Sequence, residues 1–254
     1  MEMHFVNKNY LKGYQATFKD GIESVRFYND KYMLKFIEKK YLKTDRQLII
    51  EKTHEFDHEH IVKPEFGLYD KTGFLGYGMN YIKNYDYLDS VVDNDFKNSS
   101  TTFSFRKELM LELCDIFDYF NKYNFAYYDI YGKNILYKDG DIKLIDLDGG
   151  VFEGTNNRVN YSIAYRLAQK NLALYTLSFL YNKDIFEFLS DISSLKKKDL
   201  NSILTNVPEE VKNLFYYTIN NDYHTFNNIT QSIDSISPSM YEETNEKIIK
   251  KLTL

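Results

Sequence analysis

Hydrophobic and polar residues alternate in short segments over the first third of the chain. Within residues 12–37, the segments "ESVRFYND" and "KYMLKFI" are separated by Asn29-Asp30, a turn signal, and Asp20-Gly21 marks an earlier turn. This pattern predicts a meander of three strands. The segments "IVKPEFGLYD" and "GFLGYGMNYI" predict two further strands, joined by a turn near Asp70 to Gly73.

A helical spacing interrupts these strands once and dominates the chain after Lys83. Thr44 and Gln47 form a capping-box pattern, so a helix is expected to start at "TDRQLIIEKTHEF". Apolar residues at 109, 113, 116, 117 and 120 follow the period of a helix in "SFRKELMLELCDIFDYFNKY". Further helices are expected at about 162–182, 183–192, 208–220 and 239–252.

The stretch "YYDIYGKNILYKDGDIKLIDLDGG", from Tyr127 to Gly150, breaks the helical pattern with two short apolar clusters and five aspartates. One interpretation is a polar hairpin with its turn at Asp139-Gly140. The other is a site that holds metal ions and phosphate, because carboxylate oxygens are the ligands that Mg²⁺ prefers.

Composition narrows the class of protein. The chain has 254 residues, of which 43% are apolar, so it can bury a substantial core in one domain or two lobes. A net charge of -5 gives no basic footprint for nucleic acid. The single cysteine, Cys114, fits a reducing compartment, and we expect a cytoplasmic protein. The start lacks a secretory pattern, and the longest apolar stretch, "LALYTLSFLY", is too short for a membrane span.

Strands with one inserted helix, followed by a helical half, suggest two lobes with a cleft between them. The stretch from Tyr127 to Gly150 resembles the catalytic core of the protein-kinase-like superfamily. "YYDIYGKN" is similar to the catalytic-loop signature H-R-D-x-x-x-x-N, and "LIDLDG" resembles the strand that ends in D-F-G. The resemblance implies an α+β, two-lobed kinase-like fold. Residues 1–82 would form an antiparallel five-stranded N-lobe with one helix, and residues 83–254 a mainly helical C-lobe.

The resemblance also implies roles for the residues of this stretch. Asp129 would accept the proton of the attacking hydroxyl or orient it, and Asn134 and Asp146 would hold Mg²⁺ against the phosphates of ATP. Asp148 stands where the motif has glycine. It would either join the metal site or cap the turn that follows.

The same resemblance extends to the first 82 residues. "YMLKFI" is similar to the V-A-I-K strand, so Lys35 would contact the α- and β-phosphates, and a glutamate of the next helix would pair with it. Glu51 is the first choice for this partner and Glu55 the second. The implied nucleotide contacts are Gly21, Val25, Lys35, Glu51, Met79 as gatekeeper, and the backbone of Asn80 and Tyr81.

Several residues depart from the family pattern. The region of the glycine-rich loop has only Gly21, which does not align cleanly with any of the three glycines of the motif. Tyr127-Tyr128 replaces the His-Arg pair, and Asn171 stands in a C-lobe helix where the family has Asp. The segment after Asp146 is short and lacks A-P-E. These features predict an atypical ATP- and Mg²⁺-dependent kinase that acts on a hydroxyl, expected to be Ser or Thr of a protein. A small-molecule kinase and a pseudokinase scaffold that binds a protein partner stay open as alternatives.

Overall fold

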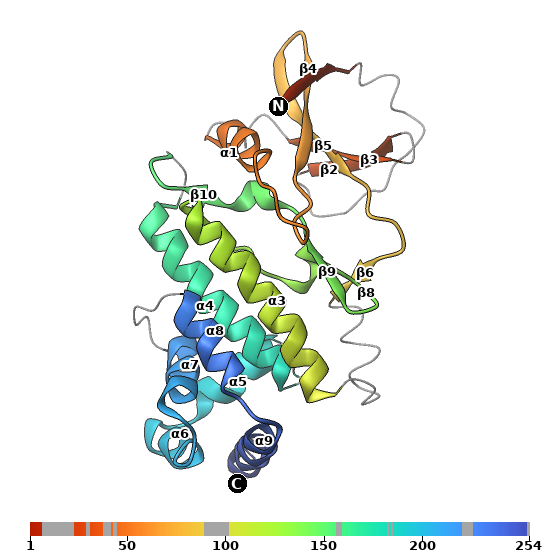
Figure 1. The fold of residues 1–254 in the computed structure, drawn as a ribbon. Coiled ribbons are helices and arrows are strands. Elements are labelled where there is room, and N and C mark those ends of the chain that lie inside the picture. The colour runs from red at the N-terminus through yellow and green to blue at the C-terminus, as the bar shows by residue number, and fades with distance from the viewer. Residues whose placement is uncertain are drawn as a thin grey trace.

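A computed structural model of the chain describes residues 1–6, 23–28, 31–37, 42, 45–88, 102–155, 159–181, 183, 185–219 and 226–252. The described part is an α+β structure with a sheet at one end and helices at the other (Figure 1). The expected α+β class is confirmed at this level.

The sheet has five strands in the order β1-β4-β5-β3-β2. Their bounds are Glu2–Phe5 for β1, Glu23–Tyr28 for β2, Tyr32–Ile37 for β3, Pro64–Asp70 for β4 and Gly73–Asn80 for β5. The expected strands β2 to β5 are confirmed, and they pair antiparallel. The expectation of a fully antiparallel sheet is wrong at β1, which pairs parallel with β4. The first strand of the expected meander, before Gly21, lies outside the described residues.

Alternation along β3 places its side chains on two different faces of the sheet. Leu34 and Phe36 belong to an apolar cluster on one face, together with Phe66 of β4. Ile37 faces the other way and packs with Ile50 of helix α1 (Arg46–Thr53). Helix α1 therefore covers the face of the sheet from which Lys35 projects.

The first turn of α1 differs from the sequence-based expectation. The helix begins at Arg46 after Asp45, whose side chain makes no capping hydrogen bond, and Thr44 lies outside the described residues. The side-chain amide of Gln47 donates to Glu51 at 2.9 Å and to the Tyr69 hydroxyl at 3.3 Å. Gln47 thus bonds along the helix and to the sheet.

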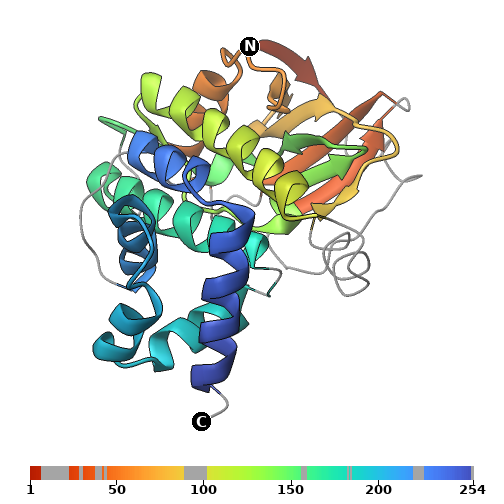
Figure 2. The ribbon, with the colours of Figure 1, turned by 60° about the horizontal axis from the view of Figure 1, so that its bottom comes forward.

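The helical half is built around two long helices, α3 (Phe103–Lys122) and α4 (Tyr161–Leu180). Each has a side-chain cap, because Thr102 accepts from Phe105 N and Asn160 accepts from Ser162 N. The others are α5 (Ile185–Ser194), α6 (Lys197–Ile203), α7 (Glu209–Ile219), α8 (Phe226–Asp234) and α9 (Pro238–Leu252), which Figure 2 shows gathered at one side of the molecule. The expected helices are confirmed, and α6 and α8 were not predicted.

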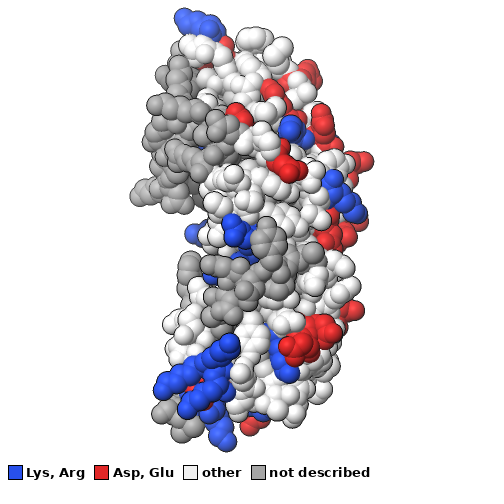
Figure 3. Space-filling model, turned by 90° about the vertical axis from the view of Figure 1, so that its left-hand side faces the viewer, with Lys and Arg blue, Asp and Glu red and all other residues white. Residues whose placement is uncertain are grey.

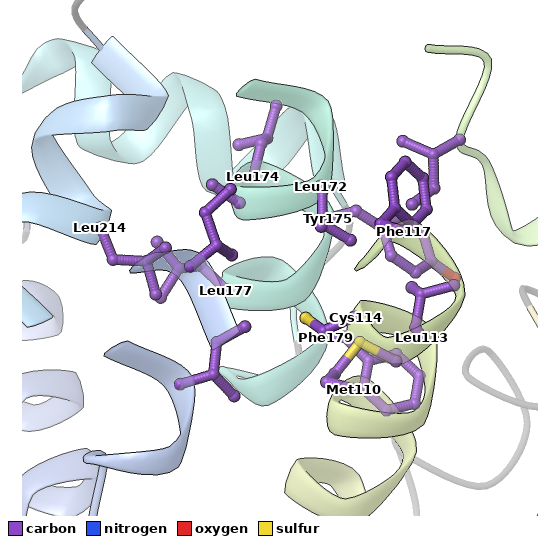
Figure 4. Close-up of a cluster of buried hydrophobic side chains, with 14 of the residues drawn as sticks. Met110, Leu113, Cys114, Phe117, Leu172, Leu174, Tyr175, Leu177, Phe179 and Leu214 are labelled. Carbon is purple, nitrogen blue, oxygen red and sulfur yellow. The ribbon is translucent and has the colours of Figure 1, made fainter. Parts of the chain in front are cut away.

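The main core lies between α3 and α4. Figure 4 shows Met110, Cys114 and Phe117 of α3 facing Leu172 and its neighbours on α4. Cys114 is fully buried, and burial raises the pKa of its thiol, so it acts as a small apolar side chain.

A short hairpin connects the helices to the sheet. Strands β8 (Ile135–Lys138) and β9 (Asp141–Leu144) pair antiparallel, and β6 (Asp86–Tyr87) lies at their edge. The turn at Asp139-Gly140 is confirmed, with φ of 50° and 93°, which suits a two-residue hairpin. Leu144 fixes the hairpin to the chain after α1, since its N–H donates to His60 O and its carbonyl accepts from Val62 N. Strands β7 (Phe125–Ala126) and β10 (Val151–Phe152), which flank this segment in the sequence, pair antiparallel.

Charged side chains are interspersed over much of the face in Figure 3, and lysine and arginine gather at its lower end. The end formed by α6 and α9 carries the exposed residues Lys196, Lys197, Lys198, Lys250 and Lys251. This basic end lies opposite the sheet. No helix within the described ranges is long and apolar enough to cross a membrane.

Candidate functional site

Three residues from distant parts of the sequence meet beneath α1. Lys35 Nζ on β3 contacts Asp146 Oδ1 and lies 2.8 Å from Asp148 Oδ1. Lys35 and Asp148 are both buried, at 4% and 3% exposure, whereas Asp146 is partly exposed. The structure therefore brings Lys35 together with two aspartates that lie more than a hundred positions away in the sequence.

Asp148 lies at the centre of this cluster. It belongs to the short helical turn η5 (Leu147–Gly149), which α1 covers. Its Oδ1 accepts from Lys35 and from the Tyr77 hydroxyl at 3.1 Å. Its Oδ2 accepts from Arg46 Nε at 2.7 Å and from Arg46 Nη2. A carboxylate has about four acceptor positions, so these donors occupy the whole of Asp148.

The two carboxylates differ in their electrostatic environment. Burial opposes ionisation of Asp148, but the charges of Lys35 and Arg46 outweigh it and hold the pKa of Asp148 below its usual value. Burial raises the pKa of Asp146 well above its usual value, and the neighbouring Asp148 adds to this rise despite Lys35. Asp148 is the ionised partner of both cations, and Asp146 is the weaker acid.

Asp146 also has an unusual backbone. Its φ of 66° and ψ of 48° lie in the left-handed region, which aspartate tolerates better than most residues. This turn directs the chain from β9 into η5, so that carboxylates two positions apart reach the same lysine.

A second polar group lies beside the cluster. Asn134, in the turn η4 (Gly132–Asn134), donates its side-chain amide to the Asp129 carbonyl at 2.8 Å and to the Tyr127 hydroxyl at 3.0 Å. The same amide lies 3.5 Å from Asp129 Oδ2. Burial raises the pKa of Asp129, while Asn134 and Lys35 oppose the rise. A Cβ placed on Gly149 would lie 3.6 Å from Asp129 Oδ2, so Asp129 borders the segment that carries Asp148.

The loop that carries Asp129 is fixed by hydrogen bonds of the Tyr127 and Asn171 side chains. Tyr127 is fully buried, and its hydroxyl lies between Asn134 and the carbonyl of Ile145, at 3.0 and 3.5 Å. Asn171 of α4 donates to the carbonyl of Tyr128 at 2.7 Å. Tyr127 and Asn171, which depart from the kinase motif in the sequence, both anchor the loop that carries Asp129.

The expected ion pair between Lys35 and Glu51 is wrong for this structure. The Glu51 carboxylate accepts from Gln47, and Glu55, the second choice, is exposed. Arg46, five positions before Glu51, is the residue of α1 that reaches the cluster. It is a cation that binds Asp148, and not an acid that pairs with Lys35. Arg46 was not a predicted site residue, because no motif in the sequence links it to the distant Asp148.

The remaining predicted nucleotide contacts lie around β3 and the end of β5. Gly21 lies outside the described residues, and Val25 pairs with Lys35 in the register of β2 and β3. Met79 is buried opposite Met33, whose side chain packs in the same apolar cluster.

Two residues after Met79 already have hydrogen-bond partners. The Asn80 side chain donates to Glu65 at 2.7 Å, and the Tyr81 N–H donates to Lys31 O at 2.8 Å. The Tyr81 N–H is therefore engaged within the protein and does not point to a free adenine contact.

The described residues of the site supply only a small set of ligands for a Mg²⁺ ion. Among the described side chains, no group of three or more His, Cys, Asp and Glu could hold a metal ion. Asp146, together with the Oδ1 of Asn134, supplies hard oxygen atoms, and Mg²⁺ commonly needs one or two protein ligands in addition to phosphate oxygens and water. Asp148 does not fit a metal ligand, because its acceptor positions are already filled.

No protein-family model matches this chain, and no curated protein matches its sequence. The function is therefore inferred from the residues of the site.

Proposed function

We propose that the chain is a two-lobed, kinase-like phosphotransferase that moves the γ-phosphate of ATP to a hydroxyl group. The acceptor that we favour is Ser or Thr of a protein. The observation that carries the proposal is the meeting of Lys35 with Asp146, 111 positions away, beside Asp129 and Asn134.

This arrangement suits phosphoryl transfer because that reaction needs positioning and charge neutralisation more than covalent chemistry. Lys35 offers a buried cation for the phosphates of the nucleotide. When bound, Mg²⁺ would neutralise phosphate charge at Asp146 and Asn134. Lys35 must then exchange its contact with Asp146 for phosphate oxygens.

Asp129 provides the group that receives the acceptor hydroxyl. Its raised pKa makes it a better proton acceptor than an ordinary aspartate, provided that it stays ionised. Asn134 and Asn171 fix the loop around it, so the carboxylate is held before the substrate arrives.

The test measures nucleotide binding and phosphate transfer separately. ATP with Mg²⁺ should raise the melting temperature of the wild type, since a ligand at a hundredfold excess over its Kd stabilises by about 2.7 kcal/mol. Asp146→Ala should lose most of this rise. Asp129→Asn should keep the rise but lose about 10²–10⁴-fold of the transfer rate, followed with labelled ATP by mass spectrometry.

Candidate acceptors are generic protein substrates, the chain itself and a panel of metabolite alcohols. Transfer to metabolites alone would identify a small-molecule kinase. An equal thermal shift in wild type and Asp146→Ala would contradict the metal assignment.

A pseudokinase scaffold is the second candidate, and one observation favours it. The two cations of the cluster, Lys35 and Arg46, are matched by two carboxylates of the chain itself, Asp146 and Asp148. A wild type that binds ATP or a protein partner but transfers no phosphate to any acceptor would support this second function.

A further inference from the structure

The buried carboxylate of Asp148 joins three elements of the sheet half to one turn. Lys35 comes from β3, Tyr77 from β5 and Arg46 from α1, and each donates to Asp148. The side chain of Asp148 is 1% exposed, that of Lys35 5% and that of Arg46 17%. The contacts are therefore made away from bulk water, where loss of one charged partner is costly.

We propose that Asp148 is the positioning residue for Lys35 and that Arg46 holds Asp148 in place. Helix α1 thus contributes a cation to the cluster, and the acid that orients the lysine comes from the segment after β9. A lysine held in this way is placed to contact the phosphates of a nucleotide, and this consequence rests on the proposed function. The positioning of Lys35 by Asp148 does not rest on it.

The geometry separates the tasks of the two neighbouring aspartates. Withdrawing Asp148 would leave Lys35 and Arg46 buried without their shared carboxylate, so this anchor stays in place. Asp146 is partly exposed and contacts Lys35 alone among the cations of the cluster. Asp146 can therefore turn towards a metal ion while Asp148 continues to hold the lysine.

The first test follows Lys35 without any nucleotide. Reductive methylation of lysines, read by mass spectrometry, reports how accessible each amine is. Lys35 should be protected in the wild type and should react about tenfold faster or more in Asp148→Asn and Arg46→Met, the scale of a lost charged hydrogen bond. Asp146→Asn should change the rate by clearly less, and Arg46→Lys should restore part of the protection.

Two internal controls separate release of Lys35 from unfolding. Lys143, which pairs with Asp141 at the hairpin, should keep its wild-type rate in every informative variant. Arg166→Met removes an exposed arginine on α4 and should leave Lys35 protected. If Asp148→Asn also exposes Lys143, Tyr77→Phe takes its place, because it removes one donor to Asp148 and leaves both cations.

The second test uses ATP with and without Mg²⁺. Asp148→Asn and Arg46→Met should weaken binding under both conditions, whereas Asp146→Asn should remove the advantage that Mg²⁺ gives. Loss of the Mg²⁺ advantage in Asp148→Asn would overturn the division of tasks. Equal release of Lys35 by Asp146→Asn, or unchanged labelling in Arg46→Met and Tyr77→Phe, would overturn the positioning role. A wild type that binds no nucleotide overturns only the proposed function, because the labelling result stands by itself.

Discussion

The aspartate at position 148 decides the charge balance of the site. With aspartate at position 148, the segment after β9 carries two carboxylates within reach of Lys35. Two ionised acids beside one cation would repel each other. In the structure, Arg46 supplies a second cation that pairs with Asp148. The cluster thus has two cations and two acids.

Glu112 on α3 offers a residue-scale test of buried charge away from the site. Its Oε2 is buried and has no hydrogen-bond partner among the residues that the structure describes, and burial is the main cause that raises its pKa. The folded state therefore binds this proton more tightly than the unfolded chain. Stability from this group is present below the unfolded value of about 4.3 and falls as pH rises through the folded pKa.

Glu112→Gln keeps the shape of the side chain and removes the charge, so it should raise the melting temperature at pH 7 and change it little at pH 4. The measurement is a melting curve at half-unit steps between these values. Glu242→Gln, at an exposed position of α9, is the matched control. A Glu112→Gln variant that is less stable at pH 7 would show that this carboxylate has a partner it needs.

A residue of the candidate site can be predicted from the sequence when its partner lies close to it along the chain. The spacing from Asp129 to Asn134 is local, and the structure places both side chains together. The partners of Lys35 were not predictable in this way, because Asp146 and Asp148 lie 111 and 113 positions from it along the chain. Arg46 lies 102 positions from Asp148, and no pattern along the chain links the two.

At the scale of elements, alternation and turn residues predicted strands β2 to β5 and the hairpin correctly. They could not predict β1, since its four residues begin the chain and pair with a strand more than sixty positions away. Helices α6 and α8 were also missed; they are short, with seven and nine residues, and depend on packing against neighbours.

Gly76 tests how tightly β5 must approach β3. Its φ is 150°, and a Cβ there would lie 1.9 Å from the carbonyl oxygen of Lys35. Gly76→Ala should therefore lower the free energy of unfolding by more than the ~1–3 kcal/mol that backbone strain alone costs, and displace β3. Gly73→Ala is the control, because Gly73 also has a positive φ, 115°, but has open space around it.

Urea denaturation of both variants measures this difference. The control should lose only the cost of backbone strain, about 1–3 kcal/mol. If the two glycine variants lost equal stability, the close approach of β5 to β3 would contribute nothing beyond that strain.

At the scale of the whole molecule, the segment after α1 ties the sheet to the helical half. Phe56 is 1% exposed, and its ring packs against rings of the helical half at centroid distances of 5.2 to 5.9 Å. These partners are Tyr119, Phe120, Tyr123, Phe125 and Phe152. The hydrogen bonds of Leu144 with His60 and Val62 continue the same junction.

Phe56→Ala should therefore do more than destabilise the fold. Loss of a buried phenylalanine costs about 3–5 kcal/mol, and Phe36→Ala, in the apolar cluster on the outer face of the sheet, should cost a similar amount. Hydrogen exchange should distinguish the two variants. Phe56→Ala should speed exchange at 57–62 and 141–152, where the halves meet, whereas Phe36→Ala should speed it mainly in β3 and β4. Because Lys35 and Asp148 lie on opposite sides of this junction, loosening it should also increase the labelling of Lys35. The same exchange pattern in both variants would mean that the sheet and the helices unfold as one unit and that Phe56 is only one core residue among many.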